Sequence, residues 1–413
     1  MLKFIVGPAM SGKTWEIQKQ AAERAKKSEK VLFVVPEQFV FSSEQMLLKV
    51  GGEGFMRTAE VTSLSKLAHK LGADGCKMAD AAAKQALMSL AVSQVSDELT
   101  IYKKQSVRAD FIPMALTAIH RLKRAGLDET KLQDLFLRAK SPFLKQKLSD
   151  LSLLSSAYNA VMGDKYFDPD DDMKRLAKIL ETNNPYQNAT IFFDAFKDFT
   201  GVEYDVLRPL IRGAKEAVFT FTSDRESFLK CDGCVLFSTV DRTALKLIEL
   251  SGKSSYETQF LDNTYFDNQF LPALERAFRT GETADVPYDG SFTVRCCSGP
   301  AEEADTVARE LENRVRSGKI RYSDAVIIAR DCKPLQGILD RALAKYDIPF
   351  FWDNRKPLSA SPIFRFLRSA LEVACGDSAK LLGCLKSGFF DLDPQAVCRL
   401  ENYAVENGKR TLT

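Results

Sequence analysis

The sequence feature that most constrains this chain is the octapeptide Gly7–Thr14, which reads GPAMSGKT and matches the pattern G-x-x-x-x-G-K-[ST]. Glycines let such a loop turn so that successive N–H groups point inward, and the next helix adds the positive end of its dipole. The apolar run Leu2–Val6 predicts a strand before the loop, and a helix is predicted from Lys13 to about Lys27. This order predicts an α/β domain with a parallel sheet.

Five positions in the loop have predicted roles in holding a phosphate chain. Gly7, Ser11 and Gly12 belong to the turn whose backbone N–H groups would surround the phosphate oxygens. Lys13 would reach the β- and γ-phosphates, and the hydroxyl of Thr14 would hold magnesium. The sequence therefore predicts binding of a nucleoside triphosphate, with ATP and Mg²⁺ as the expected cofactors.

Hydrolysis needs a second magnesium ligand and a base that activates water. The apolar run Thr190–Asp194 predicts a strand that ends in an aspartate, so Asp194 is the candidate ligand. The next residue is Ala195, which cannot accept a proton. Asp198 and Glu203 follow, and either could replace the missing base only if the chain turned back. We therefore expect weak or absent hydrolysis.

The order of predicted elements places an insertion inside the first domain. Residues 1–78 and 189–253 alternate strands with helices, whereas residues 79–188 are almost entirely helical in pattern and predict a helical subdomain. The polar segment 254–289 has little pattern and is interpreted as a connection. The predicted strands of the first domain are Leu2–Val6, Val31–Val35, Ala59–Thr62, Thr190–Asp194, Glu216–Phe221 and, with a weaker pattern, Val235–Phe237.

Residues 290–413 predict a second α/β unit. Its predicted strands are Phe292–Cys296, Ala325–Ala329 and Phe350–Trp352. Its predicted helices are Ala301–Ser317, Leu335–Tyr346 and Pro362–Val373. Arg330 follows the second strand, where an arginine can reach the γ-phosphate of a nucleotide held by the first domain, so it is a candidate for the nucleotide site. The alternative is an ordinary surface salt bridge with a neighbouring carboxylate. The helical tail ends without a recognisable stop, so this domain is expected to be truncated.

Composition constrains the partners less than the motifs do. Lysine and arginine number 58 against 55 aspartates and glutamates, and the resulting charge of +3 neither favours nor excludes nucleic acid. Contacts to DNA would come from local basic stretches and from aromatic rings on which bases stack. The candidate rings follow the first strands and are Phe39, Phe41, Phe55 and His69.

The cysteines predict neither a zinc site nor disulfides. Cys231 and Cys234 form a lone C-x-x-C without the second pair that a zinc site needs. The odd total of nine cysteines and the start without a secretory signal favour the reducing cytoplasm. No apolar run approaches the roughly 20 residues of a membrane span, so no membrane partner is expected.

Several segments resemble the B subunit of the AddAB (RexAB-type) helicase–nuclease. They are LKFIVGPAMSGKT, VLFVVPEQFVFSSEQMLLK, EVTSLSKLAHKL, IFFDAFKDFTGVEYDVLRPLI, YSDAVIIARD and YDIPFFWDNRKPLS, in the family's order along most of the 413 residues. The phosphate loop is generic, whereas the VPEQ and IPFFWDNRKPLS segments are far more specific to the family.

The resemblance implies a superfamily 1 helicase-like architecture, with a RecA-like P-loop domain that carries a helical insertion and a second RecA-like domain facing it. It implies a heterodimer that resects broken DNA ends for recombinational repair, in which the A subunit is the motor and this chain's part is to hold and scan single-stranded DNA. Carried over, Gly7, Gly12, Lys13 and Thr14 fall on the phosphate loop, Asp194 on motif II and Arg330 on the arginine of motif IV. The nuclease signature of the family is absent from this sequence.

Three other functions remain open at this point. The chain could be an active superfamily 1 DNA-dependent ATPase or translocase, although the missing glutamate at Ala195 disfavours this. It could be a structural scaffold with a vestigial loop. A small-molecule kinase would use the same loop, but the helical insertion and the second α/β unit argue against that function.

Overall fold

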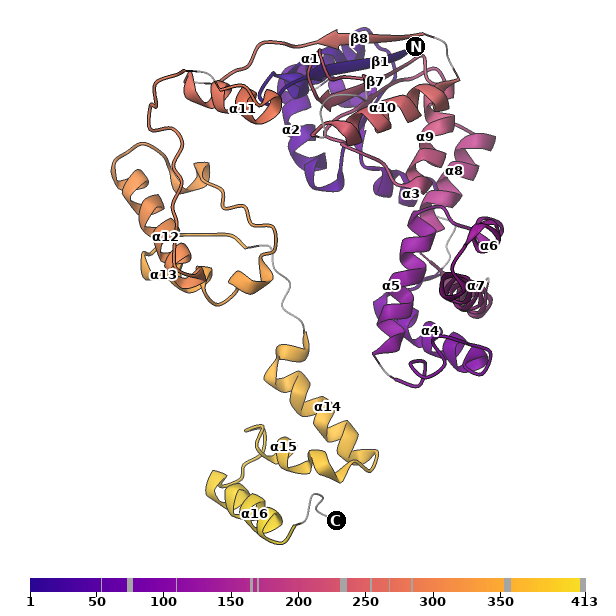
Figure 1. Cartoon of the computed structure of the whole chain (residues 1–413), viewed down its shortest axis with the longest axis vertical. Coiled ribbons are helices and arrows are strands. Elements are labelled where there is room, and N and C mark those ends of the chain that lie inside the picture. Colours follow the sequence, from indigo (N-terminus) through magenta and orange to yellow (C-terminus); the bar gives the residue numbers. More distant parts are fainter. Residues whose placement is uncertain are drawn as a thin grey trace. The chain divides into compact units, whose positions relative to one another are not determined.

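The computed structural model describes residues 1–52, 54–72, 77–108, 110–163, 166–168, 171–230, 236–252, 255–266, 268–283, 285–352 and 358–408. Two compact units divide the chain, Met1–Phe292 and Thr293–Thr413 (Figure 1).

The first unit is built on a six-stranded sheet with the order β3-β2-β6-β7-β1-β8 and parallel pairing throughout. Strands buried on both faces read as continuous apolar runs, which is why the sequence reveals the inner strands so clearly. The strands are β1 (Leu2–Gly7), β2 (Val31–Val34), β3 (Ala59–Thr62), β6 (Thr190–Phe193), β7 (Glu216–Thr222) and β8 (Tyr256–Phe260). The first five confirm the corresponding predictions.

Helices cover both faces of this sheet. Successive side chains of a strand point to opposite faces, so Phe192 packs into one apolar core and Phe193 into the other. The core containing Phe192 includes buried residues of α1 (Lys13–Lys26) and α2 (Val40–Gly51). The opposite core is covered by α3 (Leu64–Leu71), α8 (Asp172–Thr182), α9 (Gly201–Gly213) and α10 (Ser238–Ser251). The sheet is therefore the middle layer of three.

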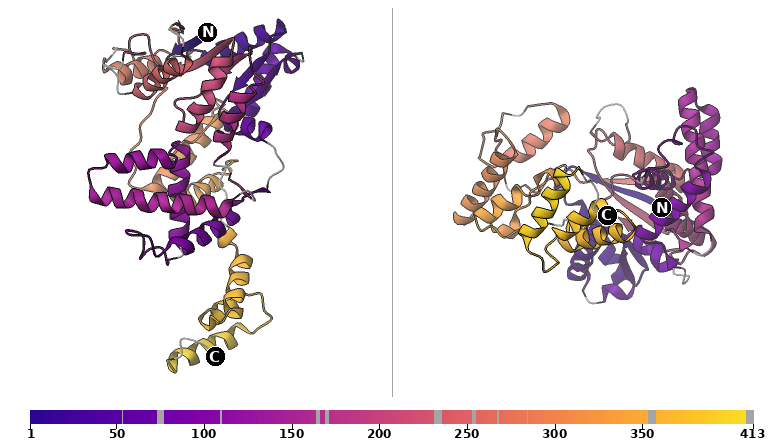
Figure 2. Two further views of the ribbon diagram at one scale, coloured as in Figure 1. Left: turned by 90° about the vertical axis from the view of Figure 1, so that its right-hand side faces the viewer. Right: turned by 90° about the horizontal axis from the view of Figure 1, so that it is seen from below.

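A helical subdomain is inserted in the chain between β3 and β6. Its helices gather beside the sheet layer and have an apolar core of their own (Figures 1 and 2). Asp150 is buried there and accepts hydrogen bonds from the backbone N–H groups of Thr100, Ile101 and Tyr102, which ties this segment to the helix that contains Asp150. The helices are α4 (Ala81–Val95), α5 (Phe111–Arg124), α6 (Glu129–Arg138) and α7 (Pro142–Met162).

Two short strands accompany the insertion, β4 (Lys77–Met78) and β5 (Tyr166–Phe167), which pair in parallel. Helix α8 lies within residues 79–188, the range predicted for the insertion, yet Leu176, Ala177 and Leu180 pack into the core of the main sheet. The helical pattern alone could not show which core this helix joins.

The interpretation of residues 254–289 as an unpatterned connection is wrong. β8 extends the sheet beside β1, and α11 (Phe270–Thr280) follows it. An edge strand has only one neighbour and stays partly exposed, so its sequence YETQF lacks the apolar run of a central strand. The predicted strand Val235–Phe237 is also not observed: Val235 lies outside the described residues, and Leu236 and Phe237 form a turn before α10.

The second unit consists of helices and extended segments. Its longer helices are α12 (Pro300–Arg316), α13 (Leu339–Lys345), α14 (Pro362–Ala374) and α16 (Pro394–Glu406), with the short α15 (Leu381–Leu385) before the last. The helices predicted at Ala301–Ser317 and Pro362–Val373 are confirmed, whereas Leu335–Tyr346 is helical only over α13.

The three strands predicted for this unit, Phe292–Cys296, Ala325–Ala329 and Phe350–Trp352, are not formed in the described structure. A strand requires a hydrogen-bonded neighbour, and these segments pair neither with one another nor with another described segment. Val326 and Ile328 accordingly remain 79% and 87% exposed. The apolar composition of these segments predicted strands, but composition does not show whether a neighbouring strand is present to pair with them.

We predict that Phe219→Ala lowers the free energy of unfolding of the first unit by about 3–5 kcal/mol, because it opens a cavity in the sheet core. The ring of Phe219 is buried and stacks on Phe193 with centroids 4.3 Å apart. Urea unfolding followed by circular dichroism measures the change. Phe41→Ala is the control, since that ring is 70% exposed and its loss should cost less than about 0.5 kcal/mol. Equal costs for the two variants would contradict this account of the core.

Candidate phosphate-binding site

The loop between β1 and α1 has the backbone shape that the motif predicts. Gly12 has a φ of 79°, in the left-handed region that favours glycine, and Lys13 is the first residue of α1. A Cβ on Gly7 would clash with the side chain of Ser11 and with the carbonyl of Leu261. Both glycines are therefore required, one by its conformation and one by the close approach of other groups. The loop fits a phosphate group in this respect, because its tight turn leads directly into a helix N-terminus.

The ammonium of Lys13 lies inside the loop. Its Nζ donates to the carbonyl oxygens of Gly7 at 2.9 Å and Pro8 at 2.6 Å and lies 3.3 Å from the hydroxyl oxygen of Ser11. Burial lowers the pKa of Lys13 from 10.5 to about 8, and the negative charges of Asp194 and Glu275 act in the opposite direction. Neutral carbonyls satisfy this cation only partly, so an anionic ligand would stabilise its charged form.

Asp194 directly follows β6 and therefore lies at the same edge of the sheet as the loop, where the parallel strands end. Its carboxylate is buried and accepts a hydrogen bond from the hydroxyl of Thr220, on the neighbouring β7, at 2.5 Å. The electrostatic effect of Asp194 on the pKa of Lys13 places the two groups in one neighbourhood. Thr14 is exposed at the start of α1. A hydroxyl and a carboxylate are oxygen ligands that suit Mg²⁺, so these two residues would hold the ion.

The residue after Asp194 is conformationally unusual. Ala195 has a φ of 64°, which a side chain with a Cβ adopts only at a cost. The two carboxylates considered as substitute bases are already engaged. Glu203 accepts from the N–H and hydroxyl of Thr200 in a capping box, and Asp198 accepts from the hydroxyl groups of Tyr204 and Thr243.

The segment after β8 runs along the loop, which the sequence interpretation missed. The N–H of Leu261 donates to the carbonyl of Val6, and the N–H of Tyr265 donates to the carbonyl of Met10 at 2.9 Å. The Tyr265 ring lies against Gly12, where a Cβ would come within 3.0 Å of it. The alternation of residues 256–260 was the available signal for this strand, but its polar residues resembled a loop.

The remaining predicted site residues are distributed as follows. Arg330 is exposed in the second unit, so its action at the loop stays a prediction. Phe55 is 2% exposed and belongs to the core beneath α2, which rules it out as a stacking platform for a base. Phe39, Phe41 and His69 are exposed. Cys231 and Cys234 both lie outside the described residues.

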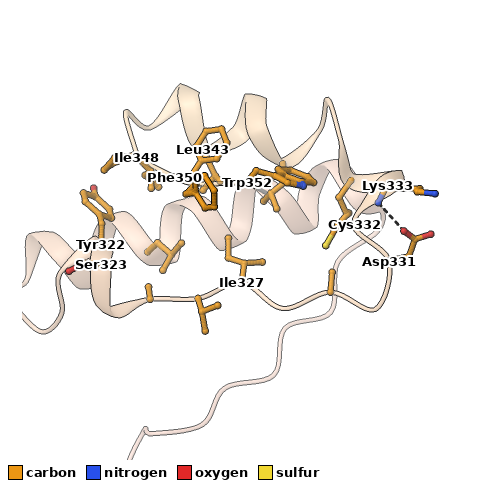
Figure 3. Close-up of a pocket in the computed structure, with 18 residues that line it drawn as sticks. Tyr322, Ser323, Ile327, Asp331, Cys332, Lys333, Leu343, Ile348, Phe350 and Trp352 are labelled. Carbon is orange, nitrogen blue, oxygen red and sulfur yellow. Dashed lines mark hydrogen bonds between the residues drawn. The ribbon is translucent and has the colours of Figure 1, made fainter. Parts of the chain in front are cut away.

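A separate cavity of about 860 Å³ lies within the second unit. Figure 3 shows Leu343, Phe350 and Trp352 on its helical side and Ile327 on the extended segment opposite. Its lining is mostly apolar, and the charged residues Asp331 and Lys333 lie at one end. Such a lining does not suit a triphosphate, so we place the candidate site at the loop.

Metal-binding clusters and membrane spans are both missing from the part of the chain that the structure describes. No group of three or more His, Cys, Asp or Glu side chains among those residues is arranged to hold a metal ion. Among the same residues, no helix is both long enough and apolar enough to cross a membrane.

Comparison with known proteins identifies the family. Residues 4–275 match the family model described as ADDB, N-terminal, which covers more than half of the chain. This chain belongs to the AddB family. The matched range extends from β1 into α11 and so includes the loop, Asp194 and the segment that carries Tyr265.

Curated relatives of this AddB-family chain are named as the B subunit of an ATP-dependent helicase/deoxyribonuclease. The protein from Caldanaerobacter subterraneus subsp. tengcongensis is 29% identical over 426 residues, which is 98% of this chain and 36% of that protein. The proteins from Thermoanaerobacter sp. (strain X514) and Bacillus subtilis (strain 168) are each 27% identical over 98% of this chain and 37% of their own length. The chain thus spans little more than a third of the relatives it matches.

We predict that Lys13 titrates near pH 8. Its pKa in the folded state is below the value of 10.5 expected in the unfolded state, so the unfolded state binds more protons between about pH 8 and pH 10.5. The contribution of Lys13 to the free energy of unfolding therefore increases as the pH rises through that window. Asp194→Asn removes an anion that raises this pKa and should lower it further. NMR of ¹³C-methylated lysines measures the titration, with Lys13→Ala to assign the signal. A midpoint near 10.5 would contradict the burial of this ammonium.

Proposed function

We propose that this chain is the ATP-binding, helicase-like N-terminal part of a B subunit in a heterodimeric helicase–nuclease. The protein would help to process double-strand breaks for recombinational repair by holding or scanning single-stranded DNA. The observation that carries the proposal is the Gly7–Thr14 loop, in which Lys13 lies among backbone carbonyls at the N-terminus of α1. The match to the AddB family, whose relatives are named as subunits of an ATP-dependent helicase/deoxyribonuclease, supports a role in DNA processing.

ATP would bind with its phosphates in the loop. Backbone N–H groups and the helix N-terminus would receive the phosphate oxygens, and Lys13 would contact the β- and γ-phosphates. Mg²⁺, when bound, supplies positive charge that neutralises the phosphates, and Thr14 with Asp194 would hold it. The buried hydrogen bond from Thr220 fixes the orientation of the Asp194 carboxylate.

Weak or absent hydrolysis is the second part of the proposal. Ala195 offers no proton acceptor beside Asp194. The carboxylate of Glu203 caps α9, and that of Asp198 accepts from two hydroxyl groups. These bonds orient both carboxylates around the start of α9, and the position directly after Asp194, where the base is expected, is held by alanine. ATP would therefore act as a structural or regulatory ligand.

The partners follow from the names of the relatives, which describe one subunit of an ATP-dependent helicase/deoxyribonuclease. We propose that the A subunit supplies the motor, that duplex ends and single-stranded DNA are the substrates, and that the complex works in the cytoplasm. Exposed Phe39 and Phe41 are candidate platforms for unpaired bases, because rings on the surface can stack with any base.

Titration with a fluorescent ATP analogue and Mg²⁺ tests nucleotide binding. Lys13→Ala should lower the affinity at least roughly 100-fold without unfolding the chain, because the phosphates lose a charge-assisted contact worth about 3 kcal/mol. Lys26→Ala is the matched control, since this lysine is exposed near the far end of the same helix. Equal affinity of the Lys13→Ala variant and the wild type would indicate a vestigial loop.

Phosphate release with and without single-stranded DNA tests the second part. We expect negligible release in both conditions, because the described site lacks a positioned base. Release that DNA stimulates and that Lys13→Ala abolishes would instead identify an active ATPase, and the assignment of ATP as a non-hydrolysed ligand would be wrong.

A further inference from the structure

The nearly buried side chain of Arg279 links helix α11 to the segment that follows β7 in the first unit. Arg279 donates from Nη1 to Asp224 at 3.1 Å and from Nε to Glu275, one turn earlier on the helix, at 3.3 Å. The side chains of Arg279 and Asp224 are only 17% and 12% exposed. An ion pair this well shielded from water holds its geometry better than a surface pair does. It brings a guanidinium to the end of β7.

The end of β7 borders the phosphate loop. Asp224 directly follows Ser223, whose N–H donates to the carbonyl of Gly7 at 3.2 Å. The same carbonyl accepts from Nζ of Lys13 at 2.9 Å. A continuous series of hydrogen bonds and one peptide bond thus links Arg279 to the lysine expected to hold the phosphates. The hydroxyl of Ser223 is buried and has no hydrogen-bond partner in the described structure.

The segment that leads into α11 contacts the loop independently. Tyr265 donates its N–H to the carbonyl of Met10 and places its ring on Gly12, five residues before the helix begins. The charge of Glu275 also reaches Lys13, whose pKa it raises against the effect of burial. The contacts of Tyr265 with the loop and the effect of the Glu275 charge on Lys13 therefore both indicate that α11 lies near the phosphate site.

We propose that Arg279 binds the terminal phosphate of the nucleotide and makes the site selective for a triphosphate over a diphosphate. The planar guanidinium forms paired hydrogen bonds with phosphate oxygens as well as with carboxylates. The γ-phosphate carries more negative charge than either carboxylate and would exchange for one of them on Arg279. This inference rests on the proposed binding of ATP at the loop.

The assignment differs from the one that the sequence suggested. Arg330 belongs to the second unit, whereas Arg279 belongs to the unit that contains the loop. Arg279 was overlooked because it lies in the segment interpreted as a connection. A γ-phosphate contact from α11 would also make the position of this helix depend on the bound nucleotide.

The test compares affinities for a non-hydrolysable ATP analogue and for ADP, each with Mg²⁺, measured by calorimetry on the full chain. Arg279→Gln should weaken binding of the triphosphate by roughly 10- to 100-fold and change ADP binding less than about threefold, since one charge-assisted contact is lost. Arg276→Gln is the matched control, because this arginine is exposed on the same helix and pairs with Glu282. Arg279→Lys keeps a charge near Asp224 and should give an intermediate loss for the triphosphate.

The outcomes separate the two proposals. If Arg279→Gln weakens both nucleotides equally or neither of them, with Lys13→Ala still losing both, the role of Arg279 is overturned and ATP binding stands. If wild type binds neither nucleotide, both proposals fall. Circular dichroism checks the fold of each variant. Should Arg279→Gln fail to fold, the ratio of the two affinities in Arg279→Lys decides, and an unchanged ratio overturns the inference.

Discussion

Parallel pairing of β1 with β7 on one side and with β8 on the other positions the phosphate loop and the segments that border it. The register sets Gly7 opposite Thr222 and Val6 opposite Phe260, so both neighbouring strands end beside the loop. Ser223 and Leu261 leave those strands already hydrogen-bonded to Gly7 and Val6. Because the strands are parallel, their carboxyl ends meet at one edge, and polar residues that follow them converge there.

Burial on both faces keeps this sheet in place. Phe193 and Phe219 stack on one face while Phe33 and Phe192 stack on the other, so the strands cannot slip in register without exposing large rings. The fixed register holds Asp194 and Thr220 side by side, which in turn fixes the carboxylate proposed to bind Mg²⁺. The same strand register therefore determines both the packing of the apolar core and the position of the polar residues at the carboxyl edge of the sheet.

The candidate site combines a phosphate-loop motif with an alanine directly after Asp194, where a base would be expected. Lys13 lies in a partly buried position that an anion would stabilise. The segment after Asp194 turns through Ala195, and the nearby carboxylates are used to cap α9 and to hold hydroxyl groups. These features support our proposal that this AddB-family chain holds a nucleotide without hydrolysing it efficiently.

The sequence by itself determined the phosphate loop, five of the six strands of the main sheet and the family, because a short motif and continuous apolar runs are local properties. Tertiary structure decided the rest. The polar edge strand β8, the placement of α8 on the main core and the approach of Arg279 to Asp224 depend on partners far away in the chain. In the second unit the apolar runs are present, but strands exist only when neighbouring backbone groups pair with them, and no sequence pattern supplies those neighbours.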